Sequence, residues 1–230
     1  MDKVGHAFTT YQTGRLMMDA FEWAGFNRKK QLIVGGSIGF VYLGIVEVMD
    51  GYSDGWGFSW GDIGANAFGT GMAVAQKYFW NDHRIFLKFS YRESGIAHYN
   101  SALLGKNMHE KILKDYNAQA YWLSFNPFLL LNKNTKVPHW LNLSLGYGAT
   151  GMIRAKDNFI YYSVASTPEV QYYFETERYR NFYLSLDLDF TRIKTRNKTL
   201  KKVFKALNVL KVPFPAIDFS KKGVRLIPLR

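Results

Sequence analysis

The hydrophobic pattern of the first third of the chain has a helical period. Apolar positions recur at helical spacing in three stretches, which predict helices over residues 4–23, 27–49 and 59–80. Gly25 stands where the first helix should stop, and Ser59 and Asp62 have the spacing of a capping box at the start of the third. The apolar positions of the first helix are Val4, Phe8, Tyr11, Met18 and Phe21.

The second of these helices is the most apolar. It begins with the basic turn Arg28, Lys29, Lys30, and its uncharged stretch covers residues 31–46. Crossing a bilayer core takes about 18 to 20 residues of helix, so we expect a buried or partly inserted helix rather than a full crossing. Gly35 and Gly39 have the small-xxx-small spacing that lets two helices approach closely, and a simple helix crossing accounts for it.

From Arg84 onward the hydrophobic period changes to two, which is typical of strands. The clearest strands are predicted over residues 84–92, 140–149 and 182–191. Weaker alternation predicts further strands over residues 121–131, 158–164, 170–175 and 224–229. Few of the connections are long enough for a crossover, so the strands are expected to pair antiparallel.

Each clear strand has one apolar face and one face of small or polar residues. Two interpretations fit this alternation: a soluble sheet packed on the three helices, or outer-membrane strands whose side chains point alternately to lipid and to the lumen. The sequence predicts an α+β fold in two parts. A glycine-rich helical part covers residues 1–82, and a mainly antiparallel β part, possibly barrel-like, covers residues 83–230.

Charge separates the two parts as well. Residues 1–82 hold six basic and eight acidic side chains, whereas residues 83–230 hold 24 basic and 10 acidic ones. A basic amphipathic helix is predicted over residues 198–211, and it fits either an anionic membrane surface or a helix docked on the sheet. The residues expected to contact lipid there are Lys198, Lys201, Lys202, Phe204, Lys205 and Leu207.

The candidate chemistry lies in the helical part. The chain has no cysteine and none of the familiar catalytic or phosphate-binding motifs. If the helices pack together, a set of polar residues spaced three or four apart should converge. Three interpretations remain open: a structural polar network, a metal site, or an acid/base centre with His6 as the titrating group. The residues at the centre of this set are Asp2, His6, Glu47, Asp50, Asp62 and Asn66. The structural interpretation extends the buried network to Ser53, Trp56, Trp60, Lys88, Asp115, Asn117 and Gln119. The other histidines, His83, His98, His109 and His139, are interpreted as polar surface.

Several short motifs follow one another along the first half of the chain. They are Asp2-Lys3-x-x-His6-Ala7, Glu47-Val-Met-Asp50-Gly-Tyr-Ser53, Trp56-Gly-Phe-Ser-Trp60-Gly-Asp62 with Ala65-Asn66, Lys88-Phe-Ser90, and Asp115-Tyr-Asn117-x-Gln119. In this order they resemble the YfiM-like family of predicted envelope lipoproteins, over about residues 1–155. The resemblance implies an exported protein at the periplasmic side of the outer membrane or within it, and it implies no reaction.

These observations lead to two functional hypotheses. The first is a non-enzymatic envelope protein that contacts anionic lipid, or another envelope protein, at the outer membrane. The second is a lipid-modifying hydrolase or transferase, with His6 as base assisted by Asp2, and with Glu47, Asp50 or Asp62 as ligands or second acid. We expect no cofactor, no bound metal and no nucleic-acid partner. Charged residues interrupt the N-terminal stretch, so it is not interpreted as a secretory leader.

Overall fold

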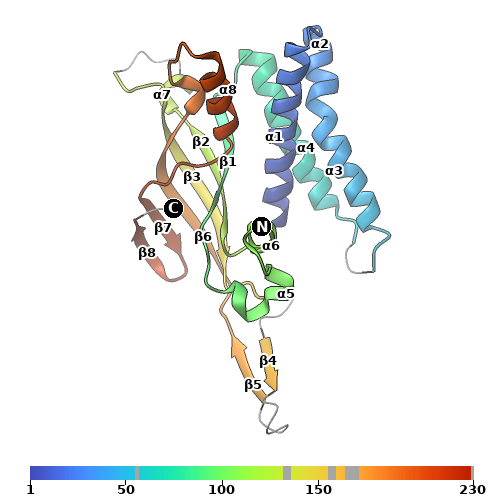
Figure 1. Ribbon diagram of the computed structural model, residues 1–230, viewed down its shortest axis with the longest axis vertical. Coiled ribbons are helices and arrows are strands. Elements are labelled where there is room, and N and C mark those ends of the chain that lie inside the picture. The colour runs from blue at the N-terminus through green and yellow to red at the C-terminus, as the bar shows by residue number, and fades with distance from the viewer. Residues whose placement is uncertain (55–56, 132–135, 155–158, 164–170, 229–230) are drawn as a thin grey trace. The chain divides into compact units, whose positions relative to one another are not determined.

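The fold is described from a computed structural model that covers residues 1–54, 57–131, 136–154, 159–163 and 171–228 (Figure 1). For residues 159–163 and 171–175 only the backbone is described. The chain divides into two compact units. The helical unit comprises residues 1–88 and 124–139, and the strand unit comprises residues 89–123 and the residues from 140 onward.

Three long helices lie side by side in the helical unit (Figure 1). The side chain of Asn27 caps the second by accepting from the Lys30 amide, and Ser59 caps the third by accepting from the Asp62 amide. The three predicted helices are therefore confirmed, although the first begins at Asp2 rather than at Val4. The helices are α1 (Asp2–Trp23), a continuous helix made of α2 (Arg28–Lys30), η1 (Gln31–Gly35) and α3 (Gly36–Asp50), and α4 (Trp60–Trp80).

Glycines allow these helices to approach closely. Gly35 and Gly39 face the backbone of α1 near Met18 and Thr10, with ideal Cβ positions 3.1 and 3.0 Å from backbone atoms there. On α4, a Cβ at Gly69 would collide with the carbonyl of Ala7. A small core of Tyr11, Met18 and Ala73 fills the space between α1 and α4. The small-residue spacing is thus a helix crossing within this chain.

Six strands form one antiparallel sheet, and β1 and β8 are its two edges. The sheet is open in this order, so the barrel-like alternative is not what the structure contains. Segment 209–211 pairs with Phe89 of β1 and covers part of that edge. The strand order is β1 (Ile85–Tyr91), β2 (Gln119–Phe125), β3 (Leu141–Thr150), β6 (Tyr179–Leu188), β7 (Ala216–Ser220) and β8 (Gly223–Ile227), and β4 (Phe159–Ser163) pairs with β5 (Gln171–Glu175) in a separate hairpin.

Two predicted strands end three or more residues earlier than expected, because side chains cap short helices there. Asn126 accepts from two amides and starts α7 (Pro127–Leu130), and Asp189 starts η3 (Phe190–Arg192). The sequence did not predict β7 or the helices between β1 and β2. The predicted basic helix is α8 (Lys198–Leu207), four residues shorter than its predicted end. The helices between β1 and β2 are η2 (Ala97–Asn100), α5 (Ser101–Leu104) and α6 (Met108–Lys114).

The sheet buries its polar face and exposes its apolar face. On β3 and β6, Ser144 and Asp187 are fully buried, whereas Leu145 and Phe182 are 46% and 55% exposed. Asn181 donates to Asp218 of β7, and Arg225 of β8 pairs with the same carboxylate. Because these polar groups satisfy one another, the interior of the strand unit tolerates them. The alternation resembles that of strands that face lipid rather than strands packed by their apolar side.

Candidate functional site

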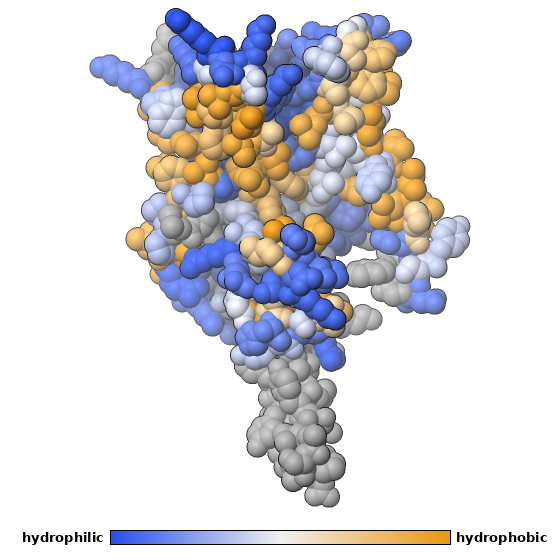
Figure 2. Space-filling view, in the orientation of Figure 1, coloured by the Kyte–Doolittle hydropathy of each residue, from blue (hydrophilic) through white to orange (hydrophobic). Residues whose placement is uncertain are grey.

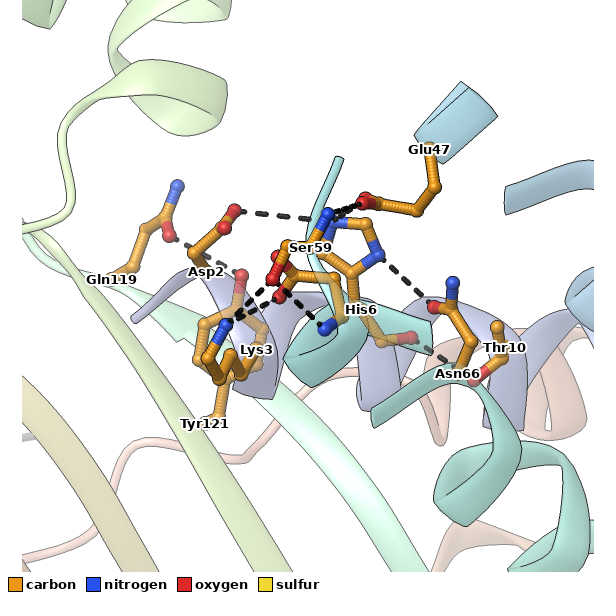
Figure 3. A network of polar contacts seen from close by, with 10 residues as sticks. Asp2, Lys3, His6, Thr10, Glu47, Ser59, Asn66, Gln119 and Tyr121 are labelled. Atoms are coloured by element: carbon orange, nitrogen blue, oxygen red, sulfur yellow. Dashed lines mark hydrogen bonds and ion pairs between the residues drawn. The ribbon is translucent and has the colours of Figure 1, made fainter. Parts of the chain in front are cut away.

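The best-assembled polar site lies where α1 begins, α3 ends and α4 begins (Figure 3). Because successive helices of this unit run in opposite directions, these three ends are neighbours. Five of the predicted residues come together there: Asp2 and His6 from α1, Glu47 from α3, and Asp62 and Asn66 from α4. With Lys3 and Ser59 they form what we call the His6 cluster.

His6 is the centre of this cluster. Its Nδ1 lies 3.0 Å from Oδ1 of the fully buried Asn66. Its Nε2 lies 3.4 Å from a carboxylate oxygen of Glu47, which is buried, and 3.9 Å from one of Asp2, which is exposed. When Nδ1 donates its hydrogen to the Asn66 amide oxygen, Nε2 faces two carboxylates. Nε2 is therefore the ring atom that a bound cation or a reacting water would meet.

Asp62 lies in the first turn of α4, and its side chain forms an ion pair with Lys3. The Lys3 ammonium donates to an Asp62 carboxylate oxygen at 3.1 Å and to the Ser59 hydroxyl at 3.2 Å. Desolvation alone would raise the pKa of Asp62, but the Ser59 hydrogen bond and the Lys3 ammonium outweigh it, so the pKa lies below its usual range. Glu47 adds a link to the loop by accepting from the Ser59 amide at 3.2 Å.

The cluster has the donor set that a divalent cation would use. Ligand atoms of Asp2, His6 and Asp62 lie within 4.8 Å of one another. With bonds of about 2.1 Å, adjacent ligand atoms of an octahedral ion stand about 3 Å apart, so small side-chain rotations would bring these atoms into range. Such a site would be rich in oxygen, and the ion would compete with Lys3 for Asp62.

Several residues predicted for the same network lie elsewhere. Asp50 ends α3, but within the described part of the chain it makes no hydrogen bond or ion pair to the His6 cluster. Ser53 is half-buried in the following turn, and Trp56 lies outside the described residues. Trp60 is 79% exposed, so its predicted burial is wrong. It is the first residue of α4, and its ring packs edge-on against Phe58.

The remaining predicted residues belong to β1 and to the strand unit. Lys88 is fully buried in β1. In the strand unit, Asp115 accepts from Ser94 and from the amide and side chain of Asn117, whose own oxygen accepts from the backbone of Met152. Gln119 donates to two carbonyls of the preceding helix. The single network expected from the sequence is therefore divided between the two units.

Sequence reasoning missed a second buried polar group in the helical unit. Arg15 is 1% exposed, and its guanidinium lies 5.7 Å from the centre of the Phe86 ring. His83, interpreted from the sequence as polar surface, is buried edge-on against Tyr11. Burial lowers the pKa of His83 to about 4, and the positive charge of Arg15 acts in the same direction. A lone arginine on an amphipathic helix gives no sign of this burial.

Comparison with known proteins gives one result for the residues that carry the His6 cluster. Residues 1–78 match the model of a family described as predicted periplasmic lipoprotein (DUF2279). The match covers about a third of the chain and stops before β1. No curated protein and no solved structure matches the chain. The match supports a location in the cell envelope, and the YfiM-like resemblance beyond residue 78 stays a prediction.

Proposed function

We propose that this chain is a non-enzymatic envelope protein that sits in or at the outer membrane and acts there as a structural or accessory component. The observation that carries the proposal is the large area of solvent-exposed apolar side chains on both units. In each unit the polar groups are gathered inside, and a soluble protein would normally show the opposite arrangement. The family match of residues 1–78 agrees with an envelope location.

In the helical unit the outward surface is one face of the continuous helix from Arg28 to Asp50. That helix has 23 residues, and it is long and apolar enough to cross a membrane by length and composition. At 1.5 Å per residue it is about 34 Å long, and a bilayer core is about 30 Å thick. Only 22% of its most apolar window is buried, which favours the inserted alternative of the sequence analysis over the buried one.

Figure 2 shows apolar side chains along the side of the molecule formed by α3. Val41, Ile45 and Val48 follow helical spacing on that face and are 52 to 57% exposed. The opposite face of the same helix packs its glycines on α1. The helix therefore has one side for the protein and one side that suits lipid.

In the strand unit the outward surface crosses four strands in register. Leu145 pairs with Leu184, which pairs with Ile217, which in turn pairs with Leu226. Phe182, Phe219 and Val224 form a second row beside them. Contiguous apolar area of this kind is a mark of contact with a membrane or with another protein.

The basic helix α8 fits the same function. Its lysines are exposed, and the apolar residues Leu200, Val203 and Leu207 are also 40 to 44% exposed. Of the predicted lipid-contacting residues, Phe204 is the one that packs inside the unit, by stacking on Phe190. Because its apolar stripe is not covered by the sheet, α8 suits an interface where lysines meet anionic headgroups.

Flotation with vesicles tests the proposal. The purified chain, exchanged out of detergent, is mixed with phosphatidylcholine vesicles or with vesicles that also contain phosphatidylglycerol, and is centrifuged through a density gradient. We expect it to float with both and to bind the anionic vesicles more strongly at low salt. A chain that stays at the bottom of the gradient as a soluble monomer with both vesicles contradicts the proposal.

A second function, a lipid-modifying hydrolase, is favoured by one observation. Asn66 contacts Nδ1 of His6, and Nε2 faces the carboxylates of the buried Glu47 and the exposed Asp2. In this arrangement His6 would take a proton from water as the water oxygen attacks a lipid ester carbonyl. The C–O bond between the acyl carbon and the glycerol oxygen would then break, the glycerol oxygen would take the proton back from His6, and the products would be a fatty acid and a lysophospholipid.

For that second function we expect His6→Gln to lower fatty-acid release from phosphatidylglycerol vesicles by about a hundredfold with an unchanged melting temperature. His139→Gln is the matched control, because His139 is an exposed histidine outside the cluster. If the unaltered chain releases no fatty acid, or if both substitutions have equal effects, His6 is not a base for this reaction.

A further inference from the structure

A groove in the helical unit combines apolar walls with two cations at its edge. It has a volume of about 730 Å³ and lies between the start of the continuous helix and the end of α4. Its cationic residues are Arg28 and Lys29. The rest of its lining is Leu32, Ile33, Val74, Tyr78 and Phe79.

The two cations are placed at the groove by the fold. Arg28 donates to the carbonyl of Tyr78 at 2.7 Å, which fixes its guanidinium beside the C-terminal end of α4. Lys29 is exposed. None of the residues that line the groove is acidic, and within the described residues neither cation forms an ion pair. By contrast, the nearby buried Lys77 pairs with Glu22 at 2.6 Å.

The walls have the chemistry of a hydrocarbon site. Ile33 and Phe79 are 59% and 75% exposed, and Leu32 and Val74 continue the surface inward to the core around Met18. Because apolar surface is more stable out of water, an occupant that covers the Phe79 ring would gain the free energy of its burial. An occupant with an apolar chain and a negative charge would cover the apolar walls and pair with the two cations.

We propose that this groove binds one anionic phospholipid, with an acyl chain along Ile33 and Phe79 and the phosphate on Arg28 and Lys29. The proposal rests on the proposed function, because it takes the occupant from the surrounding membrane. The groove lies at the N-terminal end of the continuous helix, and this end carries three basic residues in a row. If the helix is inserted in a membrane, its basic end meets the lipid headgroups. A phosphate there would receive charge-assisted hydrogen bonds.

The test counts lipids bound to the full chain in neutral detergent by native mass spectrometry. The probes are phosphatidylglycerol and phosphatidylcholine with identical acyl chains, with and without an excess of inorganic phosphate. We expect one tightly bound phosphatidylglycerol and no comparable phosphatidylcholine. Inorganic phosphate should displace little of the bound lipid, because the acyl chain contributes to binding.

Two matched pairs of variants locate the lipid. Lys29→Ala should weaken phosphatidylglycerol binding about fivefold, and Lys30→Ala, which removes the same charge one residue away from the lining, should not. Ile33→Ser should weaken it by about fivefold or more, and Leu103→Ser, at a position of similar exposure in α5, should not.

Each failure has a distinct meaning. Equal binding of the two lipids, equal effects within either pair, or full displacement by inorganic phosphate overturns the groove proposal. If the chain still floats with phosphatidylcholine vesicles, the proposed membrane function stands without the groove. If it floats with neither vesicle yet binds one phosphatidylglycerol in detergent, the groove stands and the membrane function falls.

Discussion

Replacing Gly69 with alanine is expected to lower the free energy of unfolding by about 3 kcal/mol. The added Cβ would overlap the Ala7 carbonyl oxygen and the Thr10 hydroxyl, and it would lie 2.9 Å from the Ala7 carbonyl carbon. Two of these atoms belong to the backbone of α1, so the overlap is relieved only if α1 and α4 move apart. Denaturation of the purified chain in a neutral detergent, followed by circular dichroism, measures the change.

Gly71→Ala is the matched control for this experiment. Gly71 lies on the same helix, but a Cβ there would meet nothing within 4 Å. Alanine is about 1 kcal/mol better than glycine inside a helix, so this variant should be slightly more stable than the unaltered chain. Equal melting of the two variants would mean that α1 and α4 do not approach each other at Gly69.

The helices were predictable because their signals are local. Ser59 caps α4 through the amide three residues later, and Gly25, just after the end of α1, has the positive φ of 79° that is typical of a helix stop. The sequence also predicted that Asp2, His6, Glu47 and Asp62 lie close together. Consecutive helices that pack antiparallel bring the start of one helix beside the end of the next, and these residues lie at such ends. The exposure of Trp60 was not predictable, because a tryptophan at a helix start has the same sequence signature whether it points inward or outward.

The alternation of apolar and polar residues in the strands could not predict which face of the sheet is buried. A period of two says that residues such as Ser185 and Leu184 point in opposite directions, and it does not say which direction is inside. In β3 the inner positions include Gly146, and a Cβ there would lie 2.6 Å from the Trp122 ring. Small residues on the polar face make room for Trp122, which stacks on Tyr183 and lies under the Lys211 ammonium.

The apolar face of the second helix extends beyond its uncharged stretch for a related reason. Counting uncharged residues ended the stretch at Val46, because Glu47 follows it. In the structure Glu47 turns to the inner face and is buried against His6 and the Ser59 amide. The outer face stays apolar through Val48 and Met49, which are 52% and 66% exposed. A charge on the inner side of a helix therefore does not shorten the apolar stretch on its outer side.

This face should be the most sensitive part of the molecule to added charge. The double substitution Val41→Lys with Ile45→Lys is expected to weaken partitioning into phosphatidylcholine vesicles by about 5 kcal/mol, a few thousandfold. Both positions lie near the middle of the apolar face and are 55% and 57% exposed, so the ammonium groups would enter hydrocarbon if α3 is inserted. Sedimentation binding over a range of lipid concentrations measures the partition constant.

The matched control places the same charges on another exposed helix. Met108→Lys with Leu113→Lys changes two apolar residues of α6 that are 55% and 74% exposed. Because α6 lies outside the proposed lipid surfaces on α3, on the sheet and on α8, the partition constant of this variant should stay within about twofold of that of the unaltered chain. If the two double variants lose equal affinity, added charge opposes binding wherever it is placed, and α3 has no special contact with lipid. If neither loses affinity while the unaltered chain floats, the sheet face and α8 hold the protein at the membrane, and α3 lies outside it.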